Sequence, residues 1–148
     1  MIAIGSDHGG FELKEELKKT LNELGLEFKD FGAYSTDRVD YPLVAKEVSK
    51  AVQTSECDKG ILICRSGYGM AMVANKFKGV RSAPCFEIRA AQFSRLHNNT
   101  NVLSLGADYV TVDEAKEILK AWLNTEFEGG RHQQRLDQVS EIENENMK

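Results

Sequence analysis

Cys64 stands where an apolar run meets a glycine-rich turn, in the segment ILICRSGYGM at residues 61–70. The turn offers backbone amides with little side-chain cover, and a helix is predicted to begin near Gly69. Amide groups and helix amino ends both attract negative charge. A thiol in such a place can serve as a base or nucleophile. The alternative is a buried thiol without a chemical role, because free cysteines are often core residues.

The histidines also fall in contexts where sites form. His8 follows Asp7 in the first glycine-rich turn, His97 lies in SRLHNNTN, and His132 lies in GGRHQQR. Histidine changes charge near neutral pH, and His8 and His97 lie near predicted strand or helix ends, so both are candidate site residues. A surface or capping role is the alternative for each, and their spacing is not that of a metal site.

Arg131 and Arg135 are four residues apart, which on a helix places both guanidinium groups on one face. Such a pair can form a fork around a phosphate. The alternative is an ordinary solvated surface, because arginines in a polar tail commonly face water.

The turn after Cys64 fails most phosphate-loop patterns. Met70 follows Gly69 where a Walker loop needs a lysine, and it also stands where a cysteine phosphatase loop would place its arginine. A partial dinucleotide fingerprint survives, with Gly67 and Gly69 as its first glycines and Glu87 about 20 residues on. Binding of a nucleotide or sugar phosphate without turnover is therefore the alternative function.

The elements that must position these residues alternate between short β-rich runs and amphipathic stretches. The predicted strands are residues 2–4, 27–31, 60–64, 80–85 and 102–106. The predicted helices are residues 11–24, 41–52, 69–77, 87–98 and 112–125, and a polar helix or arm follows at 131–148. We predict an α/β fold, a Rossmann-like three-layer α/β/α domain with a parallel sheet of about five strands.

Hydrophobic spacing orients these helices. Leu13, Leu17, Leu21 and Leu24 share a face with Phe11, and further inward stripes are expected for two other helices. These stripes are Val44, Val48, Ala51 and Val52, and Ala115, Ile118, Leu119 and Trp122. The continuous apolar run 60–64 is typical of a strand buried on both faces. Parallel sheets bind ligands at the carboxyl ends of their strands, which selects three turns: GSDHGG, CRSGYG and the segment around Gly106.

Composition limits the class of protein. The chain has 148 residues, a net charge of -4 and 41% hydrophobic residues, which fits one globular domain spanning 1–148. The negative charge gives no electrostatic footprint for nucleic acid or an anionic membrane. The amino terminus has no signal-peptide pattern, and the three cysteines lack structural zinc spacing, so we expect a cytoplasmic protein with reduced thiols.

Together the motifs resemble the ribose-5-phosphate isomerase type B family, which also holds allose-6-phosphate and galactose-6-phosphate isomerases. The motifs that carry the resemblance, in order, are GSDHGGFELK, DYP, GILIC, SGYGM, VANKFKGVR, SRLHNNTNVLSLG and FEGGRHQQR. The resemblance implies an aldose-ketose isomerase of carbohydrate metabolism, in the pentose phosphate pathway, that moves a proton through an enediolate without a metal or organic cofactor. It also implies a homodimer or dimer of dimers whose sites combine residues of both subunits.

The resemblance also implies roles for single residues. Cys64 matches the base, Ser66 the hydroxyl that contacts substrate, and His97 the acid that opens the sugar ring. The implied substrate-binding residues are Asp7, His8, Tyr41, Arg65, Gly67, Tyr68, Gly69, Asn98, Arg131 and Arg135. Among these, the amides of Gly67 to Gly69 and Asn98 would stabilise the oxyanion, and the two arginines of the tail would bind the phosphate.

Three departures from the family pattern stand near this site. Arg65 occupies the usual position of a glycine, and Asp108 stands where many members carry a phosphate-binding arginine. HNNTN also replaces the commoner HNDTN. Since Arg65 and Asp108 both follow strand ends, we expect their side chains to meet, with Arg65 neutralising the carboxylate. Exposure of both to solvent is the alternative.

Overall fold

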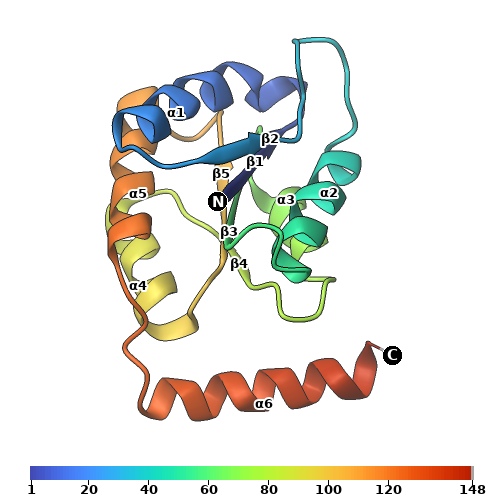
Figure 1. Cartoon of the computed structure of the whole chain (residues 1–148), viewed down its shortest axis with the longest axis vertical. Coiled ribbons are helices and arrows are strands. Elements are labelled where there is room, and N and C mark those ends of the chain that lie inside the picture. The colour runs from blue at the N-terminus through green and yellow to red at the C-terminus, as the bar shows by residue number, and fades with distance from the viewer. Residues whose placement is uncertain (148) are drawn as a thin grey trace.

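The strands lie where the apolar runs predict them. A computed structural model describes residues 1–147 and contains five parallel strands (Figure 1). These are β1 (Ile2–Ser6), β2 (Phe28–Asp30), β3 (Lys59–Cys64), β4 (Ser82–Pro84) and β5 (Val102–Gly106). The predicted α/β three-layer architecture is confirmed.

Helices follow every strand. A short 3₁₀ helix, η1 (His8–Gly10), precedes α1. The α-helices are α1 (Phe11–Glu23), α2 (Tyr41–Gln53), α3 (Tyr68–Ala74), α4 (Ile88–Asn98), α5 (Val112–Asn124) and α6 (Arg131–Asn146). The predicted helix at 69–77 is shorter than expected, because hydrogen bonds from Lys76 and Phe77 to residues three positions earlier close a tight turn after Ala74. Lys148, the end of the predicted polar arm, lies outside the described residues.

The sheet order is β2-β1-β3-β5-β4. β5 is inserted between β3 and β4, so the chain passes over the site of β5 when it runs from β3 through α3 to β4. β4 is thereby an edge strand, which suits Pro84, a residue with no N–H to donate to a further strand. The strand β3 lies at the centre of the sheet.

Alternate residues of the strands pack on opposite helical layers. Ile61 and Ile63 join the core formed with α1 and α5, whereas Leu62 and Cys64 join the core formed with α2 and α3. The predicted inward stripes of α2 and α5 are buried, but Leu24 is 43% exposed. Leu24 follows the last residue of α1, where the chain turns at Gly25 with a positive φ, and so leaves the helical face.

The last helix lies apart from the three layers. Figure 1 shows α6 extending below them, with its first turns close to α4. Its buried residues are His132 and Leu136, and Glu143 near its far end accepts a hydrogen bond from the Gly79 amide (3.1 Å). Among residues 1–147 no helix is both long enough and apolar enough to cross a membrane.

Candidate active site

The three turns selected from the sequence meet at one edge of the sheet. β1, β3 and β5 are neighbours, and Cys64 is paired with Gly106. Backbone hydrogen bonds join the turns, from Asp7 N to the Ile63 carbonyl (3.2 Å) and from Asp108 N to the Arg65 carbonyl (2.9 Å). This carboxyl edge therefore gathers the candidate residues of three separate turns.

A cavity of about 250 Å³ opens at this edge, lined by Asp7, Tyr41, Cys64, Arg65, Ser66 and Gly69. Cys64 Sγ accepts a hydrogen bond from the Gly67 amide (3.1 Å), which fixes the sulfur beneath the turn. Gly67 has φ +82° and a Cβ there would press on the backbone of Leu105, so this turn requires glycine. The glycine at position 67 thus results from the close packing of this turn around the Cys64 thiol.

Polar side chains on the first turn are held in place. Asp7 is 8% exposed, and its Oδ1 accepts a hydrogen bond from the Gly10 amide (3.1 Å). His8 Nδ1 lies 3.2 Å from both the amide nitrogen and the carbonyl oxygen of Val39, and this contact ties the turn to the loop that leads into α2. Asp7 lines the cavity, and His8 follows it at the same edge.

The turn after Cys64 uses part of its own donor capacity. The Tyr68 amide donates to Ser66 Oγ (3.3 Å), as the Gly67 amide donates to Cys64 Sγ. Two of the three amides predicted to bind an oxyanion therefore have acceptors within the turn. The Tyr68 ring is half exposed and packs against Phe86, with ring centroids 5.6 Å apart, instead of lining the cavity.

The other thiols lie outside this cavity. Burial raises the pKa of Cys85 to about 11, and burial together with the neighbouring Glu56 carboxylate raises that of Cys57. Both are 1% exposed. Cys64 is therefore the thiol that the fold places at the cavity of the carboxyl edge.

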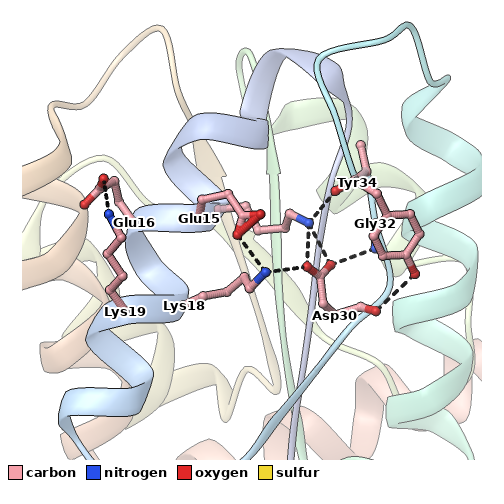
Figure 2. Close-up of polar contacts among 9 residues, drawn as sticks. Glu15, Glu16, Lys18, Lys19, Asp30, Gly32 and Tyr34 are labelled. Atoms are coloured by element: carbon pink, nitrogen blue, oxygen red, sulfur yellow. Dashed lines mark hydrogen bonds and ion pairs between the residues drawn. The ribbon is translucent and has the colours of Figure 1, made fainter.

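An ion pair between a buried lysine and a half-buried aspartate supports the first turn. Lys14 is fully buried, and its ammonium donates to both Asp30 oxygens (2.7 and 2.8 Å) and to the Ala33 carbonyl. Figure 2 shows Lys18, Gly32 and Tyr34 gathered around Asp30 as well. The segment Gly32–Ala33 then hydrogen-bonds to both backbone groups of Ser6, the residue before Asp7.

Asp30 is ionised by its neighbours. Its burial alone would raise the pKa, but hydrogen bonds from Lys14, Lys18 and the Gly32 amide outweigh burial and lower the pKa. The carboxylate therefore stays charged, and its hydrogen bonds with Lys14 tie the end of β2 to α1. Asp30 at the end of a strand suggests a cationic partner nearby. The sequence does not show which residue this is, because α1 carries three lysines.

The remaining predicted site residues lie at the opposite edge. His97 and Asn98 end α4, immediately before the chain enters β5 at Val102, whereas Cys64 is level with the last residue of β5. The length of β5, about 13 Å, thus separates the two edges. A single chain does not bring His97 to Cys64, although both lie at element ends as predicted.

The tail arginines share the edge with His97. Arg131 and Arg135 are exposed on the first turns of α6, and His132 between them is buried against α4. The His132 ring stacks on that of His97, with centroids 4.4 Å apart and planes 17° apart. Both arginines thus lie on the exposed side of α6, which agrees with the expectation that they share one helical face. Neither lines the cavity beside Cys64.

Three residues at this amino edge bring possible metal ligands together. Atoms of His97, Glu128 and His132 lie within 4.8 Å of one another. The nearly parallel imidazole planes, however, direct their nitrogen lone pairs side by side instead of toward one point. One ring would have to turn before both could bind the same ion.

Arg65 and Asp108 meet within one chain. Arg65 Nη1 lies 3.7 Å from Asp108 Oδ1, with the two side chains 64% and 54% exposed. The expected contact is therefore present, and both side chains are also largely exposed to solvent, as the alternative had it. The stem of Arg65 crosses Gly9, where a Cβ would press on it, so the first turn sets the path of the arginine.

Comparison with known proteins agrees with this geometry. Residues 2–139 match the family model described as Ribose/Galactose Isomerase. The chain is 49% identical to ribose-5-phosphate isomerase B of Escherichia coli K12 over 142 residues, 96% of this chain and 95% of the relative.

Two solved structures show the same fold. Ribose-5-phosphate isomerase B of Clostridium thermocellum superposes with a TM-score of 0.96 at 45% identity, covering 97% of each chain. The Mycoplasma genitalium enzyme with bound ribulose 5-phosphate gives 0.93 at 39% identity, covering 98% of this chain and 97% of that one. This chain belongs to the ribose/galactose isomerase family and is an aldose-ketose isomerase of sugar phosphates.

Proposed function

We propose that the chain interconverts ribose 5-phosphate and ribulose 5-phosphate, with Cys64 as the base. The observation that carries the proposal is the position of Sγ, held by the Gly67 amide at the wall of the carboxyl-edge cavity. The names of the relatives support the choice of pentose phosphate. The three cysteines are free thiols, which supports a location in the cytoplasm, a reducing compartment.

The chemistry requires one proton to move between adjacent carbons. The Cys64 thiolate removes the proton from C2 of the open aldose, and the electron pair moves through C1 onto the carbonyl oxygen, giving an enediolate. The hydroxyl proton on O2 then passes to O1, and the proton held by Cys64, or one from solvent, is added to C1, so that the ketone forms at C2 and a hydroxyl at C1. Hydrogen-bond donors at the turn, the Ser66 hydroxyl and the Gly69 amide, stabilise the charge that develops on oxygen.

The complete site in this proposal is formed by two chains. The cavity of about 250 Å³ is smaller than the usual range for ligand sites. The predicted ring-opening acid and phosphate ligands lie at the other edge of the sheet. A symmetric homodimer, or a dimer of dimers, would place the amino edge of one chain over the carboxyl edge of its partner.

His97 acts on the closed sugar in this scheme. It donates a proton to the ring oxygen while the anomeric hydroxyl loses its proton, so the C1–ring oxygen bond breaks and the aldehyde forms. Arg131 and Arg135, exposed on the same side of α6, hold the phosphate, and Asn98 contacts a substrate oxygen.

The strand order does not favour the alternative of dinucleotide binding. In that fold the acidic residue follows a strand adjacent to the glycine-rich turn. Here Glu87 follows β4, which is separated from β3 by β5. The Gly67 amide is also engaged by the thiol.

A direct assay tests the proposal. The protein is incubated with ribose 5-phosphate, allose 6-phosphate and galactose 6-phosphate, and ketose formation is followed for each. We expect the highest kcat/KM with ribose 5-phosphate. A higher value for a hexose phosphate would reassign the substrate, and no turnover together with NAD binding would support the binding module.

Mixed dimers test the sharing of the site. Cys64→Ala and His97→Asn, each expected to be nearly inactive on ribose 5-phosphate, are co-expressed with different tags. A composite site predicts recovery of about a quarter of wild-type activity, because half of the dimers are mixed and one of their two sites is intact. Sites contained in one chain predict no recovery above the separate variants.

A further inference from the structure

The His97 imidazole is enclosed between two aromatic rings. Phe93, one turn earlier on α4, stacks on one side with centroids 4.9 Å apart and planes 21° apart. His132 stacks at 4.4 Å and 17°. Such contacts restrict rotation of the ring about its own side-chain torsions. Glu128 Oε2 lies 3.9 Å from His97 Nε2.

Several contacts of the preceding segment bring His132 to this position. The Glu128 amide donates to the Leu96 carbonyl (3.1 Å), and Arg95 Nε donates to the Thr125 carbonyl (3.0 Å). Gly129 and Gly130 then turn the chain into α6 with positive φ values. The segment 125–130, which joins α5 to α6, thus fastens the start of α6 to the end of α4.

The buried imidazole of His132 forms its contact through its face. His132 is 6% exposed, and its Nε2 is buried without a hydrogen-bond partner in the described part of the chain. Burial, followed by the neighbouring His97 and Arg131, lowers the pKa of His132, with Arg135 acting in the same direction and Glu128 opposing them. Because Nε2 has no hydrogen-bond partner there, the contact that this ring makes is the stacking of its face on His97.

We propose that His132 is a positioning residue, which stacks on His97 and holds its imidazole in the orientation needed to open the sugar ring. The inference rests on the proposed role of His97. It explains why a histidine whose Nε2 has no hydrogen-bond partner among residues 1–147 is buried between two exposed arginines. Phe93 supports the other face of the same ring.

Two apolar replacements of His132 separate stacking from volume. His132→Phe keeps an aromatic face and leaves no buried donor or acceptor of this chain unpaired, since Nε2 has none. His132→Leu fills the space without an aromatic face. Gln134→Ala, an exposed position on the same helix, is the control for general changes in α6.

Two readouts separate ring opening from proton transfer. The first is conversion of ribose 5-phosphate, which begins with a closed ring. The second is uptake of deuterium at C1 of ribulose 5-phosphate in D₂O, which needs the base alone because a ketopentose with a phosphate on O5 is open-chain. We expect His132→Leu to lower the rate of ribose 5-phosphate conversion about tenfold and to leave the rate of deuterium uptake unchanged. His132→Phe should stay within about twofold of wild type on both.

The ring protons of His97 provide a readout that does not depend on turnover. Aromatic faces shift their NMR signals, so His132→Leu should move them and His132→Phe should not move them far. Equal losses for the Phe and Leu variants would overturn the proposal by showing that a nitrogen of His132 is needed. Equal losses in conversion and deuterium uptake for His132→Leu would also overturn it, because they would show that the substitution damages the whole site and not ring opening in particular.

The same measurements on His97→Asn identify which idea fails. If His97→Asn loses conversion but retains deuterium uptake, the role of His97 stands, and an unchanged His132→Leu enzyme refutes the positioning role alone. If His97→Asn loses both equally, His97 does not act in ring opening, and the proposed function itself needs revision.

Discussion

The two edges of the sheet hold their candidate site residues in different ways. At the carboxyl edge the groups are buried or fixed by backbone hydrogen bonds, as Asp7 and Cys64 are. At the amino edge Arg131 and Arg135 are exposed on a helix that lies apart from the sheet. Preorganised groups suit the proton transfer, whose barrier is sensitive to geometry, whereas exposed cations suit capture of a phosphate.

The largest expected effect is at the carboxyl edge. Cys64→Ala removes the proposed base, so kcat should fall at least about a thousandfold while KM changes little. Steady-state kinetics with ribose 5-phosphate measures both. Cys57→Ala and Cys85→Ala are matched controls for loss of a buried thiol. Near-normal kcat in Cys64→Ala, with a loss in either control, would move the base elsewhere.

Removal of the buried cation should be the next largest effect, on stability. Lys14→Met keeps much of the stem but removes the buried partner of Asp30, a half-buried carboxylate that then retains Lys18. The free energy of unfolding should fall by about 1–3 kcal/mol, as measured by chemical denaturation. Lys19→Met, an exposed lysine on the same helix, is the control. An equal change in the two variants would show that the ion pair does not stabilise the carboxyl edge.

At the amino edge we expect weaker effects, on affinity. Arg131→Ala and Arg135→Ala should each raise KM for ribose 5-phosphate about tenfold, because each removes one charged hydrogen-bond donor to phosphate. The kcat should change less. Added salt should raise KM in the wild type more than in the double variant. A loss confined to kcat would contradict a phosphate-binding role and weaken the contrast between the edges.

Acid should weaken the carboxyl edge through Asp30. Because the pKa of Asp30 is lowered in the folded state, its contribution to stability is complete above the unfolded pKa and is lost as pH falls through the folded value. Unfolding free energy measured from pH 6 to pH 2 should therefore decline less steeply in Asp30→Asn than in the wild type. Parallel profiles would show that other carboxylates dominate.

Much of the fold follows from the sequence because its strongest signals are local. The run VLSLG predicts β5 with the bounds observed, and the apolar stripe of α5 predicts its buried face. The position of β5 between β3 and β4 does not follow from local sequence, since it depends on packing between segments far apart in the chain. The burial of Lys14 depends on the same kind of packing, against Asp30.

The candidate site was predictable in its residue types more than in its arrangement. Glycines with required backbone conformations, such as Gly67, leave a sequence signal. The separation of His97 from Cys64 leaves no sequence signal. Each residue lies at the end of an element, and only the direction of α4 relative to the sheet decides at which edge His97 lies. The stacking of His132 on His97 depends on a turn of two glycines, whose presence in GGRH was the one available signal.

The smallest expected effect concerns Arg65 and Asp108, which place opposite charges beside the carboxyl edge. An exposed pair of this kind contributes about 0.2–1 kcal/mol, so its effect on stability should be slight. Its effect on substrate affinity should be larger, because Arg65 lines the cavity and Asp108 would otherwise repel the phosphate. Arg65→Gly should therefore raise KM severalfold.

A double-mutant cycle on KM tests the coupling, with Arg65→Gly and Asp108→Arg made singly and together. Asp108→Arg alone leaves two arginines in contact, whereas the double variant restores the glycine and arginine of the family pattern. We expect the double variant to recover much of the affinity lost in Arg65→Gly. Additive changes in log KM would show that the ion pair, although formed, does not act on the substrate, and the charge at this edge would then have no part in phosphate binding.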